Sequence, residues 1–341
     1  MRPELRPGPT VPFGLLVLVL CFLAACATPR VQTIDAIVTT PALHPDHILA
    51  DDGMRLPLTV WQPVGAPHAV VLALHGFNDY RRSFEGTGKF LAARGVAVYA
   101  YDQRGFGETV GAGGWFGEQR LSADVLLAAR LIRARHQGLP LYLLGESMGG
   151  AVALSALAAY PGGWADGLVL LAPAVWGRET MPWLQRAGLW LIAHTFPATR
   201  LSARGLNIRA TDNDAALRKL IEDPLVIKDT RVEALWGLTD LMDHALSIPP
   251  PAGLPTLILY GERDQIIPKR PTCRWLAVRP ASPVHRLAVY PEGWHMLTRD
   301  LRAAKVLEDI AAWLDDPASP LPSGAEVSTH LPAFCPALRG G

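Results

Sequence analysis

The chain has 341 residues, a length that allows two domains of ordinary size or one large α/β domain with an insertion. Half of the residues are hydrophobic and 18% are charged, which is too apolar a composition for a disordered polyelectrolyte. The 32 Lys and Arg residues nearly balance the 31 Asp and Glu residues, and they form no basic run. We therefore do not expect a nucleic acid as a partner.

The amino terminus is organised like an export signal. Arg2 and Arg6 precede an apolar run over 14–23, which is shorter than the roughly 20 apolar residues that span a bilayer. The sequence Leu-Ala-Ala-Cys at 23–26 resembles a bacterial lipobox, and this resemblance implies that residues 1–25 are removed and that Cys26 is lipidated. An ordinary secretory signal is the alternative. We expect an exported lipoprotein held on a membrane surface, the outer membrane if the cell is Gram-negative.

Two of the four cysteines remain for the folded domain. Cys21 leaves with the signal and Cys26 is the lipidation site, so Cys273 and Cys335 are left in an oxidising compartment. They either form a disulfide or are two unrelated thiols. None of the cysteines has the spacing of metal ligands, so we predict neither a metal nor another cofactor.

The body of the chain alternates strands and helices. Segments 46–50 and 56–61 flank the turn Asp52-Gly53 and read as an antiparallel hairpin. Short apolar runs typical of parallel strands covered on both faces occupy 69–74, 96–101, 139–144, 168–171, 256–260 and 284–290. Helical spacing lies between them at 84–94, 122–136 (with Ser122 as N-cap), 148–160, 268–278 and 299–314. This order predicts a doubly wound, mostly parallel sheet with its ligand site at the carboxyl ends of the strands.

The regular alternation stops over 173–255, where helical stretches follow one another. We interpret 173–255 as a helical cap inserted into a core made of 26–172 and 256–315, and 316–341 as a Pro/Ser/Gly-rich tail, mobile unless Cys335 tethers it. The cap is rich in large apolar side chains that either pack on the core or line a covered substrate pocket: Trp176, Met181, Trp183, Trp190, Phe196, Leu235 and Trp236. Trp183, Ala187, Trp190, Leu191 and His194 share one helical face.

A candidate nucleophile follows the third parallel strand. Gly145-Glu146-Ser147-Met148-Gly149 lies between a buried strand and a helix, which is the context of a nucleophile elbow. The two glycines permit the sharp turn that exposes the Ser147 hydroxyl above the sheet. The alternative is a glycine-rich turn whose serine only caps the helix.

Later strand ends supply an acid and a base. Asp264 follows the strand at 256–260, and His295 follows the strand at 284–290. A serine hydroxyl needs a base to take its proton and an acid to orient that base, so we assign Ser147, His295 and Asp264 as a triad. Glu262 is the rival acid, and we prefer Asp264 because it lies deeper in its loop.

The second half of an oxyanion hole is expected after the strand at 69–74. His75-Gly76-Phe77 ends that strand, so the backbone N–H groups of Phe77 and Met148 are the expected donors to a developing oxyanion. A simple turn at the end of the strand is the alternative. Asp102 to Gly107 closes the next strand, and we assign it no chemical role.

With these motifs the sequence resembles the monoacylglycerol lipase and lysophospholipase-like α/β-hydrolases, over about residues 51–314. The resemblance implies a serine esterase that acts on a single-chain lipid or a similar small acyl ester, beneath a cap at 173–255. A peptidase or amidase with the same triad, a short-chain esterase and a non-catalytic lipoprotein with a hydrolase fold remain alternatives. The oligomeric state is not predicted.

Overall fold

The computed structural model describes residues 28–34, 38–202, 205, 207–277, 282–327 and 335. The expected signal sequence and Cys26 therefore lie outside the described residues. Within them the elements in chain order are β1 (Ala42–Leu43), β2 (His47–Leu49), β3 (Arg55–Trp61), β4 (Ala69–Leu74), η1 (Arg81–Phe84), α2 (Glu85–Ala92), β5 (Val96–Tyr101), α3 (Glu118–Arg135), β6 (Leu141–Glu146), α4 (Met148–Ala159), β7 (Gly167–Leu171), η2 (Arg178–Thr180), α5 (Trp183–Thr195), β8 (Arg200–Ser202), α6 (Asp214–Glu222), β9 (Asp229–Arg231), α7 (Val232–Ser247), β10 (Thr256–Gly261), α8 (Lys269–Ala277), β11 (His285–Tyr290), η3 (Leu297–Arg299), α9 (Ala303–Asp315) and β12 (Glu326–Val327).

Ten strands of the described chain form one sheet in the order β1-β2-β3-β5-β4-β6-β7-β10-β11-β12. Strands β5, β4, β6, β7, β10 and β11 run parallel, while β1 to β3 and β12 are antiparallel edges. The mostly parallel, doubly wound sheet predicted from the alternation of elements is confirmed, and the structure has the α/β-hydrolase fold.

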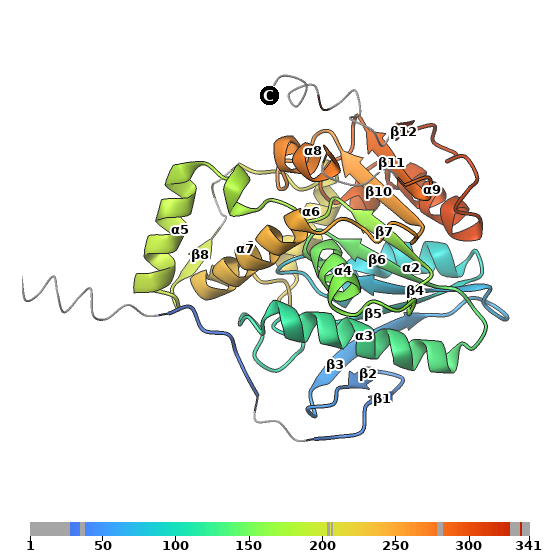
Figure 1. Cartoon of the computed structure of the whole chain (residues 1–341), viewed down its shortest axis with the longest axis horizontal. Helices are drawn as coiled ribbons and strands as arrows, with labels where there is room; N and C mark the ends of the chain where they lie inside the picture. Colours follow the sequence, from blue (N-terminus) through green and yellow to red (C-terminus); the bar gives the residue numbers. More distant parts are fainter. Residues whose placement is uncertain are drawn as a thin grey trace, which may run out of the picture.

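Each face of this sheet is covered, because alternate side chains of a buried strand point to opposite sides. Along β4, Val70, Leu72 and Leu74 pack in one apolar cluster with residues of α3 and α4. Val71 and Ala73 pack in a second cluster with residues of α2 and α9. Figure 1 shows the sheet between these helices.

The chain between β7 and β10 forms a separate layer that contains α5, β8, α6, β9 and α7 (Figure 1). Helix α7 packs on α4 and on α5, so it joins this layer to the core. On the face of α5 that the sequence identified as apolar, Trp183 is 71% exposed and Trp190 is 53% exposed. The buried residue of this helix is Ala193, which lies on another face. Phe196 is also exposed. Of the two alternatives for the large apolar side chains of this region, packing on the core holds for Trp176 and Met181 and does not hold for Trp183, Trp190 and Phe196. No helix in the described ranges is long and apolar enough to cross a membrane.

Two predicted boundaries differ from the structure for local reasons. Helix α3 begins at Glu118, after Gly117 at φ 83°, so Ser122 lies buried inside the helix and is not its N-cap. Strand β6 continues through Gly145 and Glu146, because Glu146 still pairs with Leu171 in parallel register.

The start of the expected tail is part of the domain. Strand β12 pairs with β11, where Val327 lies opposite Leu287. A disulfide joins Cys273 of α8 to Cys335, with a Cα–Cα distance of 5.6 Å. Residues 316–327 are thus fixed against the sheet, and of the two possibilities for this segment, mobile or tethered through Cys335, the structure shows the tethered one.

Candidate active site

Ser147 lies in a strained turn between β6 and α4. Its backbone has φ 53° and ψ −115°, a conformation that L residues rarely adopt and that surrounding structure must hold in place. A Cβ on Gly149 would lie 2.0 Å from the carbonyl oxygen of Leu74, and one on Gly145 would lie 2.6 Å from the backbone of Gly150. Both positions therefore require glycine, as an elbow packed tightly between strand and helix does.

Asp264 and His295 are hydrogen bonded. The Nδ1 atom of His295 lies 2.8 Å from Oδ2 of Asp264, and both side chains are nearly buried. Oδ1 of Asp264 accepts hydrogen bonds from the backbone N–H groups of Ile266 and Ile267, so the orientation of the carboxylate is fixed. The rival Glu262 instead faces Lys269 at 3.3 Å.

The loops that carry this acid and base touch each other. A Cβ on Gly261 would lie 2.5 Å from the carbonyl carbon of Gly293, and Arg263 donates its backbone N–H to Gly293. Burial lowers the pKa of His295, but the charge and hydrogen bond of Asp264, with a contribution from Glu146, more than offset this, so the pKa is raised overall. The Ser147 hydroxyl makes no hydrogen bond to His295 within the described residues.

The loop after β4 lies against the elbow. A Cβ on Gly76 would be 3.5 Å from Cβ of Ser147, so the backbone of this loop passes directly beside the serine. Neither the N–H of Phe77 nor that of Met148 donates a hydrogen bond to any described residue. Both amides can therefore donate to an oxyanion formed at Ser147.

The side chain of His75 links that loop to the segment after β5. Its ring Nε2 accepts the backbone N–H of Gln103 at 3.0 Å, so its proton resides on Nδ1, which lies 2.9 Å from the carbonyl oxygen of Gly76. Burial lowers the pKa of His75 and favours this neutral form. The Gln103 side chain donates to the His75 carbonyl in return.

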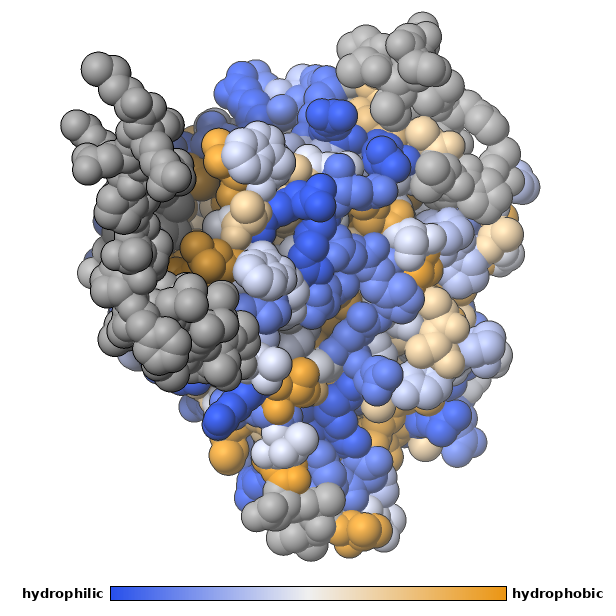
Figure 2. Space-filling model, turned by 60° about the vertical axis from the view of Figure 1, so that its left-hand side comes forward, coloured by the Kyte–Doolittle hydropathy of each residue, from blue (hydrophilic) through white to orange (hydrophobic). Residues whose placement is uncertain are grey.

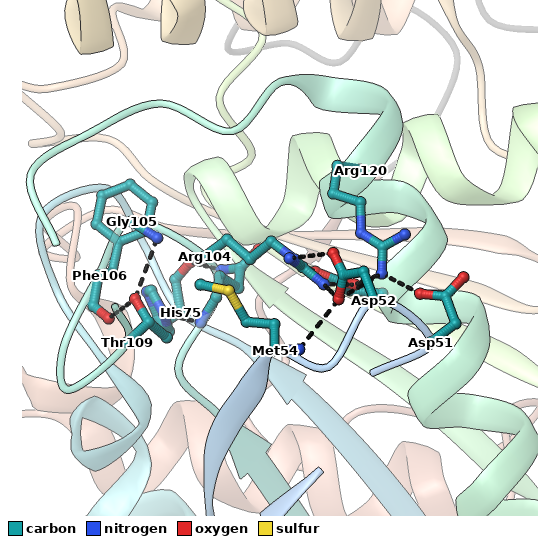
Figure 3. Close-up of polar contacts among 11 residues, drawn as sticks. Asp51, Asp52, Met54, His75, Arg104, Gly105, Phe106, Thr109 and Arg120 are labelled. Atoms are coloured by element: carbon teal, nitrogen blue, oxygen red, sulfur yellow. Dashed lines mark hydrogen bonds and ion pairs between the residues drawn. The ribbon is translucent and has the colours of Figure 1, made fainter. Parts of the chain in front are cut away.

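Gln103 belongs to the segment from Asp102 to Gly107, and an ion cluster holds this segment in place. Arg104 is buried and contacts Asp52 at 2.7 and 2.9 Å and Asp124 at 2.5 Å. Figure 3 shows Arg104 beside Asp52, with Arg120 and Asp51 continuing the cluster toward the surface. The sequence analysis assigned this segment no role. The sequence does contain a signal for a structural role: the charged residues Asp102 and Arg104 stand next to glycines directly after the buried strand at 96–101.

A second buried ion cluster was also missed. Arg299 donates to Asp79 at 2.7 Å and to Glu146 at 2.6 Å. Glu146 directly precedes Ser147, so this contact brings the loop of His295 to the elbow. In the described ranges no group of three or more His, Cys, Asp or Glu side chains is placed to bind a metal ion.

Comparisons with known proteins agree with this architecture. A family model described as serine aminopeptidase, S33, matches residues 65–302. The chain belongs to this family. It is 27% identical over 277 residues to the monoacylglycerol lipase of Mycolicibacterium smegmatis, which covers 77% of this chain and 93% of that protein. It is 26% identical over 280 residues to the monoglyceride lipase of Homo sapiens, covering 79% of this chain and 89% of the human protein.

Solved structures show the same fold. A soluble variant of monoglyceride lipase from Saccharomyces cerevisiae, in complex with a substrate analog, superposes with a TM-score of 0.67 over 85% of this chain and 98% of that chain, at 20% identity. The monoacylglycerol lipase of Paleococcus ferrophilus gives 0.62 over 77% of this chain and 99% of that chain, at 23% identity. The family resemblance expected from the motifs is confirmed, and the chain is a carboxylic ester hydrolase that resembles monoglyceride lipases.

Proposed function

We propose that this enzyme hydrolyses carboxylic esters of single-chain lipids, of the monoacylglycerol or lysophospholipid type, through an acyl-enzyme. The observation that carries the proposal is the strained Ser147 elbow beside a loop network that also holds the bonded pair Asp264 and His295. The names of the relatives support the monoacylglycerol class, and the lysophospholipid class is what the resemblance of the motifs implies.

In the proposed reaction the Ser147 hydroxyl attacks the ester carbonyl while His295 takes its proton at Nε2. Asp264 keeps the His295 proton on Nδ1 and stabilises the imidazolium. The N–H groups of Phe77 and Met148 donate to the oxyanion, each contributing about 3 kcal/mol to the transition state. His295 then protonates the leaving alcohol, and a water deprotonated by His295 releases the fatty acid from Ser147.

Peptide or amide cleavage is the second candidate, because the matching family is described as a serine aminopeptidase. A lipid esterase and a peptidase differ in how their activity depends on the length of the acyl chain. Each methylene buried in an apolar pocket contributes about 0.8 kcal/mol, which corresponds to about fourfold in kcat/KM. A lipid esterase should therefore gain kcat/KM with every added methylene until its pocket is full, and a peptidase should not.

The experiment has two stages. A fluorophosphonate probe should label the purified enzyme but not Ser147→Ala, and kcat of this variant should fall by about 10⁶-fold while it remains folded. p-Nitrophenyl esters from acetyl to palmitoyl, monoacylglycerols, lysophospholipids and aminoacyl amides are then compared. Highest activity on acetyl esters or aminoacyl amides would contradict the lipid substrate class without contradicting the triad. Equal turnover by Ser147→Ala would remove the triad itself.

We also propose that lipid chains on Cys26 hold the enzyme on a membrane, with the cap facing it. The first described residues support this orientation, since Gln32 donates its backbone N–H to Trp115, and the Trp115 ring lies against Gly237 of α7. Large apolar side chains are more than half exposed on the neighbouring α5: Trp183, Leu184, Trp190 and Leu191. Figure 2 views the molecule from this side, where apolar residues lie among hydrophilic ones.

The anchor is tested by cell fractionation. Cys26→Ser should leave the membrane fraction, because a protein without its acyl chains loses most of its affinity for the bilayer. Cys21→Ser is the matched control and should remain in the membrane, since residue 21 belongs to the segment expected to be removed. Membrane retention of a correctly cleaved Cys26→Ser protein would contradict the anchor.

A further inference from the structure

One guanidinium group connects the three loops that surround Ser147. Arg299 lies four residues after His295, in η3. Its Nη1 donates to Oδ2 of Asp79 at 2.7 Å, and its Nη2 donates to Oε1 of Glu146 at 2.6 Å. Asp79 follows Phe77 by two residues, and Glu146 directly precedes Ser147. The loop of the base, the loop of the oxyanion donor and the elbow therefore meet at Arg299.

These three charges are largely shielded from water. The side chain of Glu146 is 2% exposed, that of Asp79 is 7% exposed and that of Arg299 is 15% exposed. Charges in such surroundings are stable only with partners in good geometry, and removal of one partner leaves the others uncompensated. The planar guanidinium presents its donors in a fixed fork, so it also sets the distance between the two carboxylates.

The carboxylates are in turn fixed to their loops. Oδ1 of Asp79 accepts the backbone N–H of Tyr80 at 2.9 Å, and Glu146 is the last residue of β6 in register with Leu171. A shift of Arg299 would therefore displace backbone and not only side chains. The contact differs in this respect from a surface ion pair, which contributes little to geometry.

We propose that Arg299, Asp79 and Glu146 form one positioning unit, which fixes the loops of Phe77, Ser147 and His295 relative to one another for the reaction. This inference rests on the proposed function, because it assigns a role in a reaction performed by Ser147 and His295. Within the described residues no hydrogen bond joins this unit to the side chain of Ser147 or of His295, so we assign it a positioning role through the loops that carry them.

The unit also determines the charge that His295 experiences. The charged groups that face the loop of His295 are Asp264 after β10, Glu146 at the end of β6, Asp79 after β4, Arg299 and Asp300 from its own segment, and Asp212 and Arg209 from the cap. Within this set, Glu146 raises the pKa of His295 and Arg299 lowers it. Removal of one or the other should therefore shift the pKa of His295 in opposite directions.

The pH dependence of kcat/KM measures that shift, since its acid limb reports the pKa of the base in the free enzyme. With a soluble p-nitrophenyl ester, Arg299→Met should move the acid limb to higher pH, and Glu146→Gln should move it to lower pH. In Arg299→Met, kcat should fall by about 100-fold, because the reacting groups are misplaced, while KM changes little. Arg299→Lys retains the charge but not the fork, so kcat should fall with the acid limb close to its original pH.

A matched control is available at the opposite end of the sheet. Arg286 lies near the start of β11, is 9% exposed and pairs with Glu326 of β12. The Arg286 side chain is 10% exposed, against 15% for that of Arg299, so Arg286→Met removes a guanidinium of comparable exposure whose hydrogen bonds go to Glu326 and Pro317 and not to the loops of Ser147 and His295. It should lower the melting temperature and leave both the acid limb and kcat unchanged.

The outcomes separate this inference from the proposed function. No hydrolysis by the parent enzyme, or equal hydrolysis by Ser147→Ala, contradicts the proposed function. An active parent enzyme in which Arg299→Met and Glu146→Gln move the acid limb in the same direction, or leave it in place, contradicts the positioning unit. If Arg299→Met does not fold, the other two variants test the proposal. An acid limb that does not move in Glu146→Gln would overturn it, and so would a parental kcat in Arg299→Lys.

Discussion

The hydrogen bonds of Asp264 determine what an amide would do at this position. In Asp264→Asn the side-chain oxygen should stay where Oδ1 is now, because the backbone N–H groups of Ile266 and Ile267 need an acceptor there. The amide nitrogen is then placed 2.8 Å from Nδ1 of His295, in the position of Oδ2. It can only donate, so the proton of His295 moves to Nε2. The ring nitrogen that should take the proton of Ser147 is thereby blocked.

Asp264→Asn should lower kcat strongly. A base held in the wrong tautomer lowers kcat by about 10⁴-fold in a serine protease triad, which is equivalent to about 5.5 kcal/mol at 25 °C. Loss of the Asp264 charge also removes the main effect that raises the pKa of His295, so burial then lowers this pKa. The acid limb of the residual kcat/KM profile should therefore move to lower pH.

The assay compares Asp264→Asn with Glu262→Gln on one soluble ester over pH 5 to about 9, with melting temperatures measured in parallel. Glu262 faces Lys269 near the surface and does not contact His295, so its variant should keep kcat within about twofold. A larger loss in Glu262→Gln than in Asp264→Asn would show that the acid was assigned to the wrong residue. An Asp264→Asn enzyme with more than a tenth of parental kcat would refute the tautomer argument.

Two further predictions concern stability. Replacing both Cys273 and Cys335 by Ser removes a crosslink between positions 62 apart and should lower the free energy of unfolding by roughly 4 kcal/mol, measured by urea denaturation of the double variant against the oxidised parent. An unchanged midpoint would contradict it. Gly149→Ala places a methyl group against the Leu74 carbonyl, so it should lower the free energy of unfolding by about 1–3 kcal/mol and also lower kcat. Gly188→Ala in α5 is the control: the added methyl group meets no atom within 4 Å, so stability and kcat should stay at the parental values. Parental stability of Gly149→Ala would show that the elbow can relax.

The reactive loops could be predicted because each one follows a strand. Ser147, Asp264 and His295 all come directly after apolar runs, and the carboxyl ends of parallel strands meet at one edge of a sheet. A local pattern was therefore enough to predict that Asp264 and His295, 31 positions apart, lie together, in agreement with their hydrogen bond. The placement of Ser147 beside His295 for proton transfer stays a prediction. The boundaries of β6 could not be predicted in this way, because pairing of Glu146 with Leu171 extends the strand beyond its apolar run.

The orientation of α5 shows what periodicity leaves open. Spacing identified one face with Trp183, Trp190 and Leu191, and it did not reveal whether that face meets the core. In the structure these side chains are more than half exposed, and the small Ala193 is buried. The answer depends on how α7 approaches α5, which is a tertiary contact without a local signal.

The buried charges next to Ser147 could not be derived from the sequence for the same reason. Arg299 contacts Asp79 across 220 positions and Glu146 across 153 positions, and each of them resembles an ordinary surface residue when the chain is read alone. A core built for stability alone would replace such charges by apolar side chains, because buried ion pairs seldom contribute more than a well-packed apolar alternative. Their presence beside a serine in strained backbone conformation therefore indicates that placement of the loops, and not stability, accounts for these residues.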